Sequence, residues 1–186
     1  GPVTGRRGAG RRRWWQFPRP DAREFSVGPV GVRVVPGEVL WLRGANGSGK
    51  TTLLRAIAGL DGAPGTRIPV ALMLQRAGDQ VVDTTVRGFV GRAGEPLGLD
   101  PDAHPLDLGA TDLRLAQFLA VAGLGRPVLL ADEPDDGLDH RGRGVMHGLI
   151  AEQLRAGTAL VITCHDADFM GEVARYARVS CLNLDQ

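Results

Sequence analysis

Residues 44–51 read Gly44-Ala45-Asn46-Gly47-Ser48-Gly49-Lys50-Thr51. They match the pattern of a glycine, four arbitrary residues, a second glycine, a lysine and a serine or threonine. The apolar run 39–42 precedes them, and residues 50–60 place four aliphatic side chains on one face of an amphipathic helix. A strand, a glycine-rich loop and a helix in this order predict a loop that binds phosphate.

The residue types of the loop explain how it would bind a nucleotide. Glycines let the main chain curl so that successive N–H groups face inward, and the start of the helix adds partial positive charge. Lys50, the only lysine among the 22 basic residues of the chain, reaches the β- and γ-phosphates, and the Thr51 hydroxyl can bind Mg²⁺. We therefore expect a nucleotide and Mg²⁺ as the bound cofactors. The predicted cofactor-binding residues are Gly44, Ala45, Asn46, Gly47, Ser48, Gly49, Lys50, Thr51 and Thr52.

Two carboxylates follow a second apolar run. Val128 to Ala131 read as a buried strand, and Asp132 and Glu133 stand at its end. We expect Asp132 to hold Mg²⁺ and Glu133 to accept a proton from an attacking water molecule. This strand is predicted to run beside strand 39–42, so that the acids face the phosphate loop.

Length and composition limit the class of protein. The chain has 186 residues, a net charge of +1, 43% apolar and 23% charged residues, which suits one globular domain and excludes wholesale disorder. No apolar run approaches the roughly 18 residues of a membrane span, so any membrane role goes through a partner. Cys164 and Cys181 cannot form a disulfide framework and suit a reducing compartment.

Strands and helices alternate along the chain, which predicts an α/β fold of the P-loop NTPase type. We expect a mostly parallel central sheet flanked by helices, an N-terminal antiparallel β part and a reduced helical subdomain at about 76–122. The predicted strands are 24–27, 30–35, 39–42, 70–74, 128–131 and 159–162. The predicted helices are 50–60, 113–121 and 140–155.

The N-terminal region is basic: the first 23 residues hold seven arginines and one acid. Residues 1–13 are predicted to form a flexible basic arm, and residues 14–186 a single nucleotide-binding domain. A solvated tail is the favoured interpretation of the arm, ahead of contact with nucleic acid or anionic lipid.

These motifs, with the segments around them, resemble the ATP-binding cassette (ABC) ATPase family over most of the chain. Gln75, after strand 70–74, corresponds to the glutamine that contacts Mg²⁺ and couples to a transport partner. Residues 75–86 are similar to cassettes of energy-coupling-factor type vitamin and metal importers. Residues 135–139 match the segment where two subunits meet, and His165 matches the histidine at a strand end that acts on the γ-phosphate.

The resemblance implies an ATPase subunit of a transporter, located in the cytoplasm and peripheral on the inner face of the cell membrane. It implies catalytic roles for Glu133, His165 and Gln75, and Mg²⁺ ligation by Thr51, Gln75 and Asp132. Two cassettes close over two ATP molecules in this family, and a separate membrane subunit carries the solute. Direct binding of nucleic acid is not expected. Importers are slightly favoured over exporters, and the sequence does not indicate the substrate.

One motif departs from the family. The family's signature motif binds the γ-phosphate of the nucleotide held by the opposite subunit. It corresponds here to residues 106–112, and the alignment is ambiguous by one residue. Leu108 or Asp107 therefore stands where the motif has serine. An acid there repels the γ-phosphate. We therefore expect a second ABC subunit, and favour a heterodimer with a subunit whose signature is intact over a homodimer. No aromatic residue stands clearly in the adenine-stacking position, which Phe17 and Phe25 bracket.

Three other functions stay open at this point. A soluble ABC-type ATPase would act on nucleic acid or ribosomes, and a poorly hydrolysing regulatory subunit would explain the weak signature. A P-loop kinase is disfavoured because Glu133, Asp139 and His165 suit hydrolysis and no acceptor-binding lid is recognisable.

Overall fold

The computed structural model describes residues 23–27, 30–91, 94 and 97–185. The predicted basic arm, residues 1–13, and Phe17 lie outside the described residues. Within the described ranges no helix has the length and apolar character needed to cross a bilayer.

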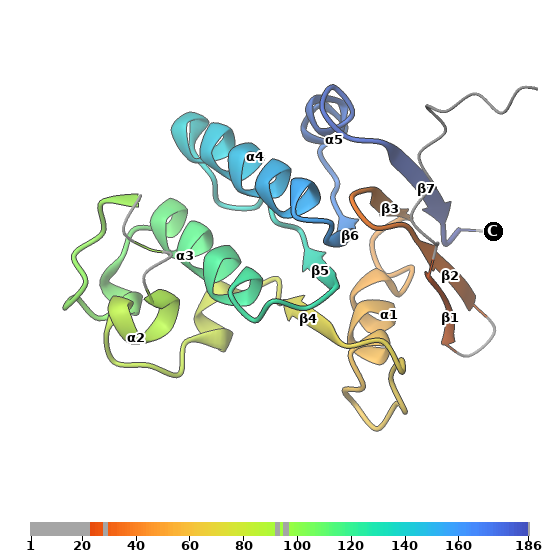
Figure 1. Ribbon diagram of the computed structural model, residues 1–186, viewed down its shortest axis with the longest axis horizontal. Coiled ribbons are helices and arrows are strands. Elements are labelled where there is room, and N and C mark those ends of the chain that lie inside the picture. Colours follow the sequence, from red (N-terminus) through yellow and green to blue (C-terminus); the bar gives the residue numbers. More distant parts are fainter. Residues whose placement is uncertain (1–22, 28–29, 92–93, 95–96, 186) are drawn as a thin grey trace, which may run out of the picture.

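The described chain forms a parallel sheet of five strands in the order β4-β5-β6-β3-β7. A separate antiparallel pair, β1 (Arg23–Val27) with β2 (Val30–Val34), precedes it. The predicted parallel sheet with an N-terminal antiparallel part is therefore confirmed (Figure 1). The strands of the large sheet are β3 (Val39–Arg43), β4 (Val70–Met73), β5 (Val128–Asp132), β6 (Ala159–Thr163) and β7 (Val179–Asn183).

The predicted neighbour of the phosphate-loop strand is wrong. β3 pairs with β6 on one side and with β7 on the other. β5 pairs with β6, so it is separated from β3 by one strand. A physical reason is the short crossover through one helix, which brings β6 directly beside β5, as sequential strands usually lie. Both strands are buried along their whole length, so their hydrophobicity could not distinguish their positions.

Helices cover both faces of the sheet (Figure 1). On one face Leu129 and Leu160 pack in a core with residues of α3, α4 and α5, and on the other Leu130 and Val161 pack with residues of α1 and β2. This alternation is the two-residue period of a strand buried on both sides. The helices are α1 (Lys50–Ile57), α2 (Val86–Val90), α3 (Ala110–Ala122), α4 (His140–Arg155) and α5 (Ala167–Val173).

The helix bounds differ from the expectations in α1 and in α3, which also ends one residue later than predicted, at Ala122. α1 ends at Ile57 rather than at residue 60, with Ala58 as its C-cap and Gly59 at a positive φ of 77°. α3 begins three residues earlier than predicted, at Ala110, after the N-cap Gly109. α4 has the predicted bounds because Asp139 caps it, its Oδ1 accepting the Gly142 N–H at 2.6 Å.

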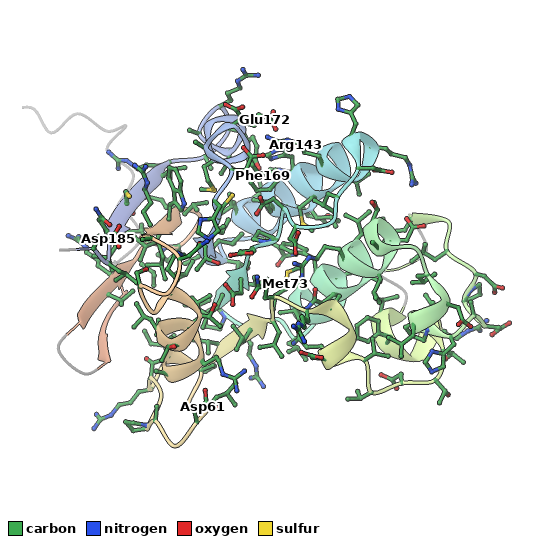
Figure 2. The ribbon with its side chains drawn as sticks, turned by 180° about the vertical axis from the view of Figure 1, so that it is seen from behind. Asp61, Met73, Arg143, Phe169, Glu172 and Asp185 are labelled. Carbon is green, nitrogen blue, oxygen red and sulfur yellow. The ribbon has the colours of Figure 1, made fainter. Side chains whose placement is uncertain are left out.

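A polar cluster joins α4 to α5. Arg143 donates to Asp166 Oδ2 at 2.6 Å and to Glu172 Oε2 at 2.9 Å, near the Phe169 ring (Figure 2). Hydrogen bonds from Arg143 lower the pKa of both carboxyl groups. Because Asp166 is also the N-cap of α5, the cluster fixes the helix that follows His165.

Candidate active site

The phosphate loop connects β3 to α1, and its glycines adopt conformations that other residues avoid. Gly47 and Gly49 have φ of 82° and 90°, in the left-handed region that favours glycine. A Cβ on Gly44 would lie 2.3 Å from Ser48 Oγ, so a side chain at that position would require Ser48 to move. The loop thus has the tight curl that exposes main-chain N–H groups to an anion.

Lys50 and Asp185 brace the loop. Lys50 is 7% exposed, and its ammonium donates to the carbonyl oxygens of Gly44 at 2.7 Å and Ala45 at 2.9 Å. The Ala45 N–H donates to both carboxylate oxygens of Asp185, at 2.9 and 3.0 Å. The loop is therefore anchored from its own helix and from the segment that follows β7.

A cavity of about 440 Å³ lies beside the loop. Three predicted site residues from other elements, Gln75, Glu133 and His165, line it together with loop residues. They follow β4, β5 and β6, so the cavity lies at the carboxyl edge of the parallel sheet, where ligands bind in open α/β folds. The loop residues that line it are Asn46, Gly47, Gly49, Lys50, Thr51 and Thr52.

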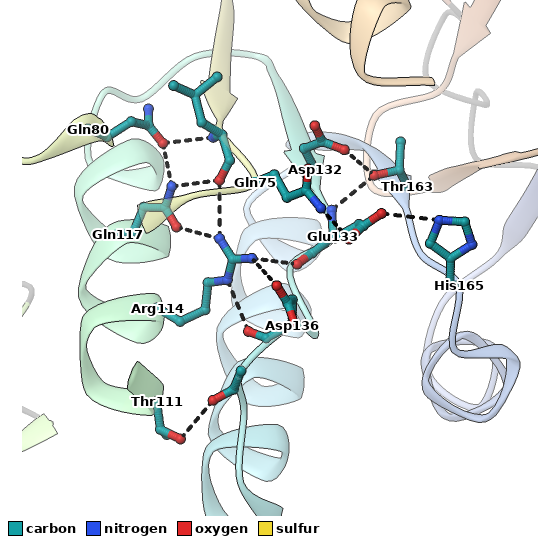
Figure 3. A network of polar contacts seen from close by, with 12 residues as sticks. Gln75, Gln80, Thr111, Arg114, Gln117, Asp132, Glu133, Asp136, Thr163 and His165 are labelled. Atoms are coloured by element: carbon teal, nitrogen blue, oxygen red, sulfur yellow. Dashed lines mark hydrogen bonds and ion pairs between the residues drawn. The ribbon is translucent and has the colours of Figure 1, made fainter. Parts of the chain in front are cut away.

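Glu133 lies between Gln75 and His165 (Figure 3). Gln75 Nε2 donates to Glu133 Oε2 at 2.8 Å, and His165 Nε2 lies 3.2 Å from Glu133 Oε1. Glu133 has φ of 49°, a left-handed conformation that costs a non-glycine residue about 1–3 kcal/mol. Its N–H donates both to the carbonyl and to the hydroxyl of Thr163, which helps to hold this conformation.

Asp132, the last residue of β5, is buried, 2% exposed, and its Oδ1 accepts the Thr163 hydroxyl at 2.6 Å. The predicted Mg²⁺ ligands are a hydroxyl on Thr51, a side-chain amide on Gln75 and this carboxylate. Oxygen donors of these kinds are those that Mg²⁺ prefers. Within the described residues the buried Ser48 Oγ has no hydrogen-bond partner, so the loop also holds a spare polar group. The residues present fit both a phosphate chain and Mg²⁺.

The weak signature segment leads into α3. Pro105–Asp107 form a short 3₁₀ helix and Gly109 is the N-cap of α3, with no side-chain hydrogen bond at that cap. Asp107 is exposed and Leu108 is partly buried. The Thr111 hydroxyl donates to the Gly137 carbonyl at 3.2 Å and accepts from the Asp139 N–H at 3.0 Å. The signature segment is thereby bonded to segment 135–139.

Sequence reasoning missed five polar residues around the site. Gln80 lies in segment 75–86 and Thr163 stands two residues before His165, but no role was predicted for either. Arg114 and Gln117 interrupt an otherwise apolar helix three residues apart, a spacing that brings side chains together and could have revealed them. No signal pointed to Asp185. All five form hydrogen bonds to main-chain groups of the loops that carry the site.

Residues 27–82 match the family model described as ABC transporter. The zinc import ATP-binding protein ZnuC 2 of Hahella chejuensis is 31% identical over 176 residues, which cover 83% of this chain and 71% of that protein. The cytochrome c biogenesis ATP-binding export protein CcmA of Hyphomonas neptunium is 31% identical, with 74% and 81% covered. The chain belongs to the ABC transporter ATP-binding family.

Other ABC proteins are longer than this chain. It covers 32% of an ABC transporter ATP-binding protein of Streptomyces coelicolor with 32% identity, and thus spans about a third of that length. Among solved structures, cbiO1 from Clostridium perfringens, part of the ABC transporter complex cbiONQ, has a TM-score of 0.64 at 22% identity, with 83% of this chain and 77% of that chain covered. The dimeric ABC cassette MJ0796 has a TM-score of 0.63 at 16% identity, with 88% and 92% covered. These two structures share the ABC fold.

Proposed function

We propose that this ABC-family chain binds and hydrolyses ATP as the nucleotide-binding subunit of a transporter, with a separate membrane subunit carrying the solute. The observation that carries the proposal is the placement of Glu133 between Gln75 and His165 in the cavity beside the phosphate loop. Relatives of this chain are named as a zinc import and a cytochrome c biogenesis export protein, so the direction of transport stays open.

The site residues divide the work of phosphoryl transfer, which is mostly positioning and electrostatics. The loop N–H groups and Lys50 bind the phosphate chain. Thr51, Gln75 and Asp132 would hold Mg²⁺, which neutralises charge on the β- and γ-phosphate oxygens. Glu133 polarises the attacking water and takes its proton. His165 donates to the γ-phosphate or orients Glu133, whose Oε1 lies 3.2 Å from its Nε2.

The signature segment supports a heterodimer. At the start of α3 the main-chain N–H groups are free of a side-chain cap, but Leu108 has no hydroxyl and Asp107 adds negative charge. A γ-phosphate facing this segment from the opposite subunit would be bound poorly. We therefore infer a partner cassette with an intact signature, and peripheral attachment of the pair to the cytoplasmic face of the membrane. A homodimer with two equal, fast ATPase sites would contradict the heterodimer.

Two variants test the ATPase. Lys50→Ala removes the only ammonium of the loop, so calorimetry with MgATP should show at least about tenfold weaker binding. Glu133→Gln keeps the size of the side chain but removes the base, so ATP binding should persist while turnover falls about 100-fold or more. If the parent chain binds no nucleotide with Mg²⁺ present, the ATPase proposal fails. Slow turnover that Glu133→Gln leaves unchanged would instead identify a regulatory nucleotide-binding subunit, which the weak signature also suits.

A further inference from the structure

Arg114 of α3 is buried beneath the candidate site, with 3% of its surface exposed. Its guanidinium donates to three main-chain carbonyls from two separate loops: Nη1 to Leu74 at 3.1 Å, Nη2 to Glu133 at 2.9 Å and Nε to Asp136 at 3.2 Å (Figure 3). Nη1 also donates to Gln117 Oε1 at 2.9 Å. The planar fork of an arginine suits several acceptors in fixed directions.

The three carbonyls belong to residues next to the chemistry. Leu74 immediately precedes Gln75, whose side chain donates to Glu133 Oε2. Glu133 is the residue with a positive φ, and its carbonyl is the main-chain group on its C-terminal side. Its N–H end is bonded to Thr163, so Arg114 and Thr163 hold opposite ends of this residue.

A second contact secures the Gln75 side of the site. Gln117, also fully buried, donates from Nε2 to the Leu74 carbonyl at 2.8 Å and to the Gln80 side-chain oxygen. Gln80 in turn accepts from the Leu74 N–H at 2.7 Å and donates to the Leu72 carbonyl at 2.8 Å. β4 lies at the edge of the sheet. The Gln80 side-chain amide therefore forms the hydrogen bonds at the end of β4 that a further strand would otherwise form.

We propose that Arg114 is a positioning residue for hydrolysis: it sets the main chain before Gln75 and the main chain of Glu133 at a fixed separation, with Gln117 supporting the Gln75 side. Arg114 does not itself line the cavity, and in the described residues its hydrogen bonds go to the loops after β4 and β5 and to Gln117, none of them to the phosphate loop. Its loss would therefore shift the two catalytic side chains and leave the nucleotide-binding loop in place. This inference rests on the proposed ATPase function.

The positive charge of Arg114 also interacts with the acidic residues at the end of β5. Four carboxylates, on residues 132, 133, 135 and 136, surround the guanidinium and raise its pKa, while burial lowers the pKa by more. The Asp136 carboxylate itself lies 3.9 Å from Nη2. A buried cation beneath clustered acids offsets their mutual repulsion. Arg114→Lys keeps this charge and loses the fork, so it isolates the geometric part.

Hydrogen exchange on the full chain tests the positioning without any need for activity. Arg114→Lys should speed amide exchange at least about tenfold in both segments 74–81 and 133–139, and Gln117→Leu should do so in 74–81 alone. Phe118→Leu is the matched control, because Phe118 is a fully buried neighbour on the same helix in the apolar core. It should raise exchange broadly through α3 rather than in the two loops. A broad rise for Arg114→Lys, or a rise in only one segment, would overturn the proposal.

Steady-state ATPase kinetics provide the second readout. Arg114→Lys should lower kcat about 10- to 100-fold, since displacements near 1 Å can cost about 100-fold, while KM and the calorimetric affinity for MgADP stay within about threefold. The partly exposed Arg55, paired with Asp61, gives the control Arg55→Lys, with kcat unchanged. Unchanged kcat in Arg114→Lys would refute the role. If the parent chain hydrolyses no ATP, the ATPase proposal fails, and the exchange pattern alone still decides whether Arg114 positions both loops.

Discussion

Replacing Thr163 with valine removes one hydroxyl and keeps the shape of the side chain. Thr163 is fully buried at the end of β6. Its hydroxyl donates to Asp132 Oδ1 at 2.6 Å and accepts the Glu133 N–H at 2.9 Å. The substitution therefore tests how strongly one central side chain stabilises the two neighbouring acids.

The two hydrogen bonds of the Thr163 hydroxyl contribute unequally to the free energy of unfolding. A hydrogen bond to a charged group contributes about 1.5–3 kcal/mol, and Asp132 is 2% exposed, so water cannot replace the lost donor. The Glu133 N–H keeps its bond to the Thr163 carbonyl at 3.1 Å, so the loss of the hydroxyl as an acceptor adds little. We expect Thr163→Val to lower the free energy of unfolding by about 2–3 kcal/mol.

Urea unfolding followed by circular dichroism measures the change. With a denaturant slope of about 2–3 kcal/mol per molar, the midpoint should fall by roughly 1 M while the slope stays the same. Thr163→Ser is the control, because it keeps the hydroxyl and loses one methyl, at a cost of about 0.8 kcal/mol. If the valine variant were as stable as the parent chain, the bond to Asp132 would contribute nothing and the reasoning would fail.

Three further predictions concern other parts of the fold. Arg143→Met should destabilise the protein above about pH 4.5, because the two carboxylates it binds have pKa values lowered from 3.8 and 4.5 in the folded state. That stabilisation is lost as the pH falls through the lowered pKa values, so the difference in melting temperature should narrow as the pH falls below about 4.5 and close only below those lowered values; a gap constant down to pH 3 would contradict the ion pairs. A thiol reagent should modify one cysteine in the native chain and two in denaturant, since Cys181 is exposed while burial raises the pKa of the Cys164 thiol; rapid native reaction of Cys164 would disprove this. Phe118→Ala should cost about 3–5 kcal/mol in urea unfolding because the ring is fully buried, and a loss under 1 kcal/mol would mean that the core collapses around the cavity.

Local patterns in the sequence predicted much of the fold. The phosphate loop is contiguous, so its glycines, Lys50 and the following helix could be assigned from spacing alone. The strands β5 and β6 were recognisable because both are unbroken apolar runs buried on both faces. The helix α4 was predicted at its observed bounds, and the structure shows Asp139 as the N-cap that begins it.

Features that depend on distant contacts were not predictable. The pairing of β6 with β3 joins residues more than 100 positions apart, and hydrophobicity is equal in both competing strands. β7 is a half-exposed edge strand and α5 has seven residues, so neither has a long periodic pattern. The position of Arg114 beneath two loops depends on the docking of α3, which no local spacing encodes.

The place of β6 between β3 and β5 has a consequence for biosynthesis. The phosphate loop leaves the ribosome before β6, and the strand that joins it to the acid-bearing strand is not complete until Thr163 has been made. A nascent chain that stops before this point can form the loop and α1 locally but has no means of bringing the carboxylates to them. Such distant pairing slows folding, so ligand affinity should emerge abruptly and late as the polypeptide lengthens.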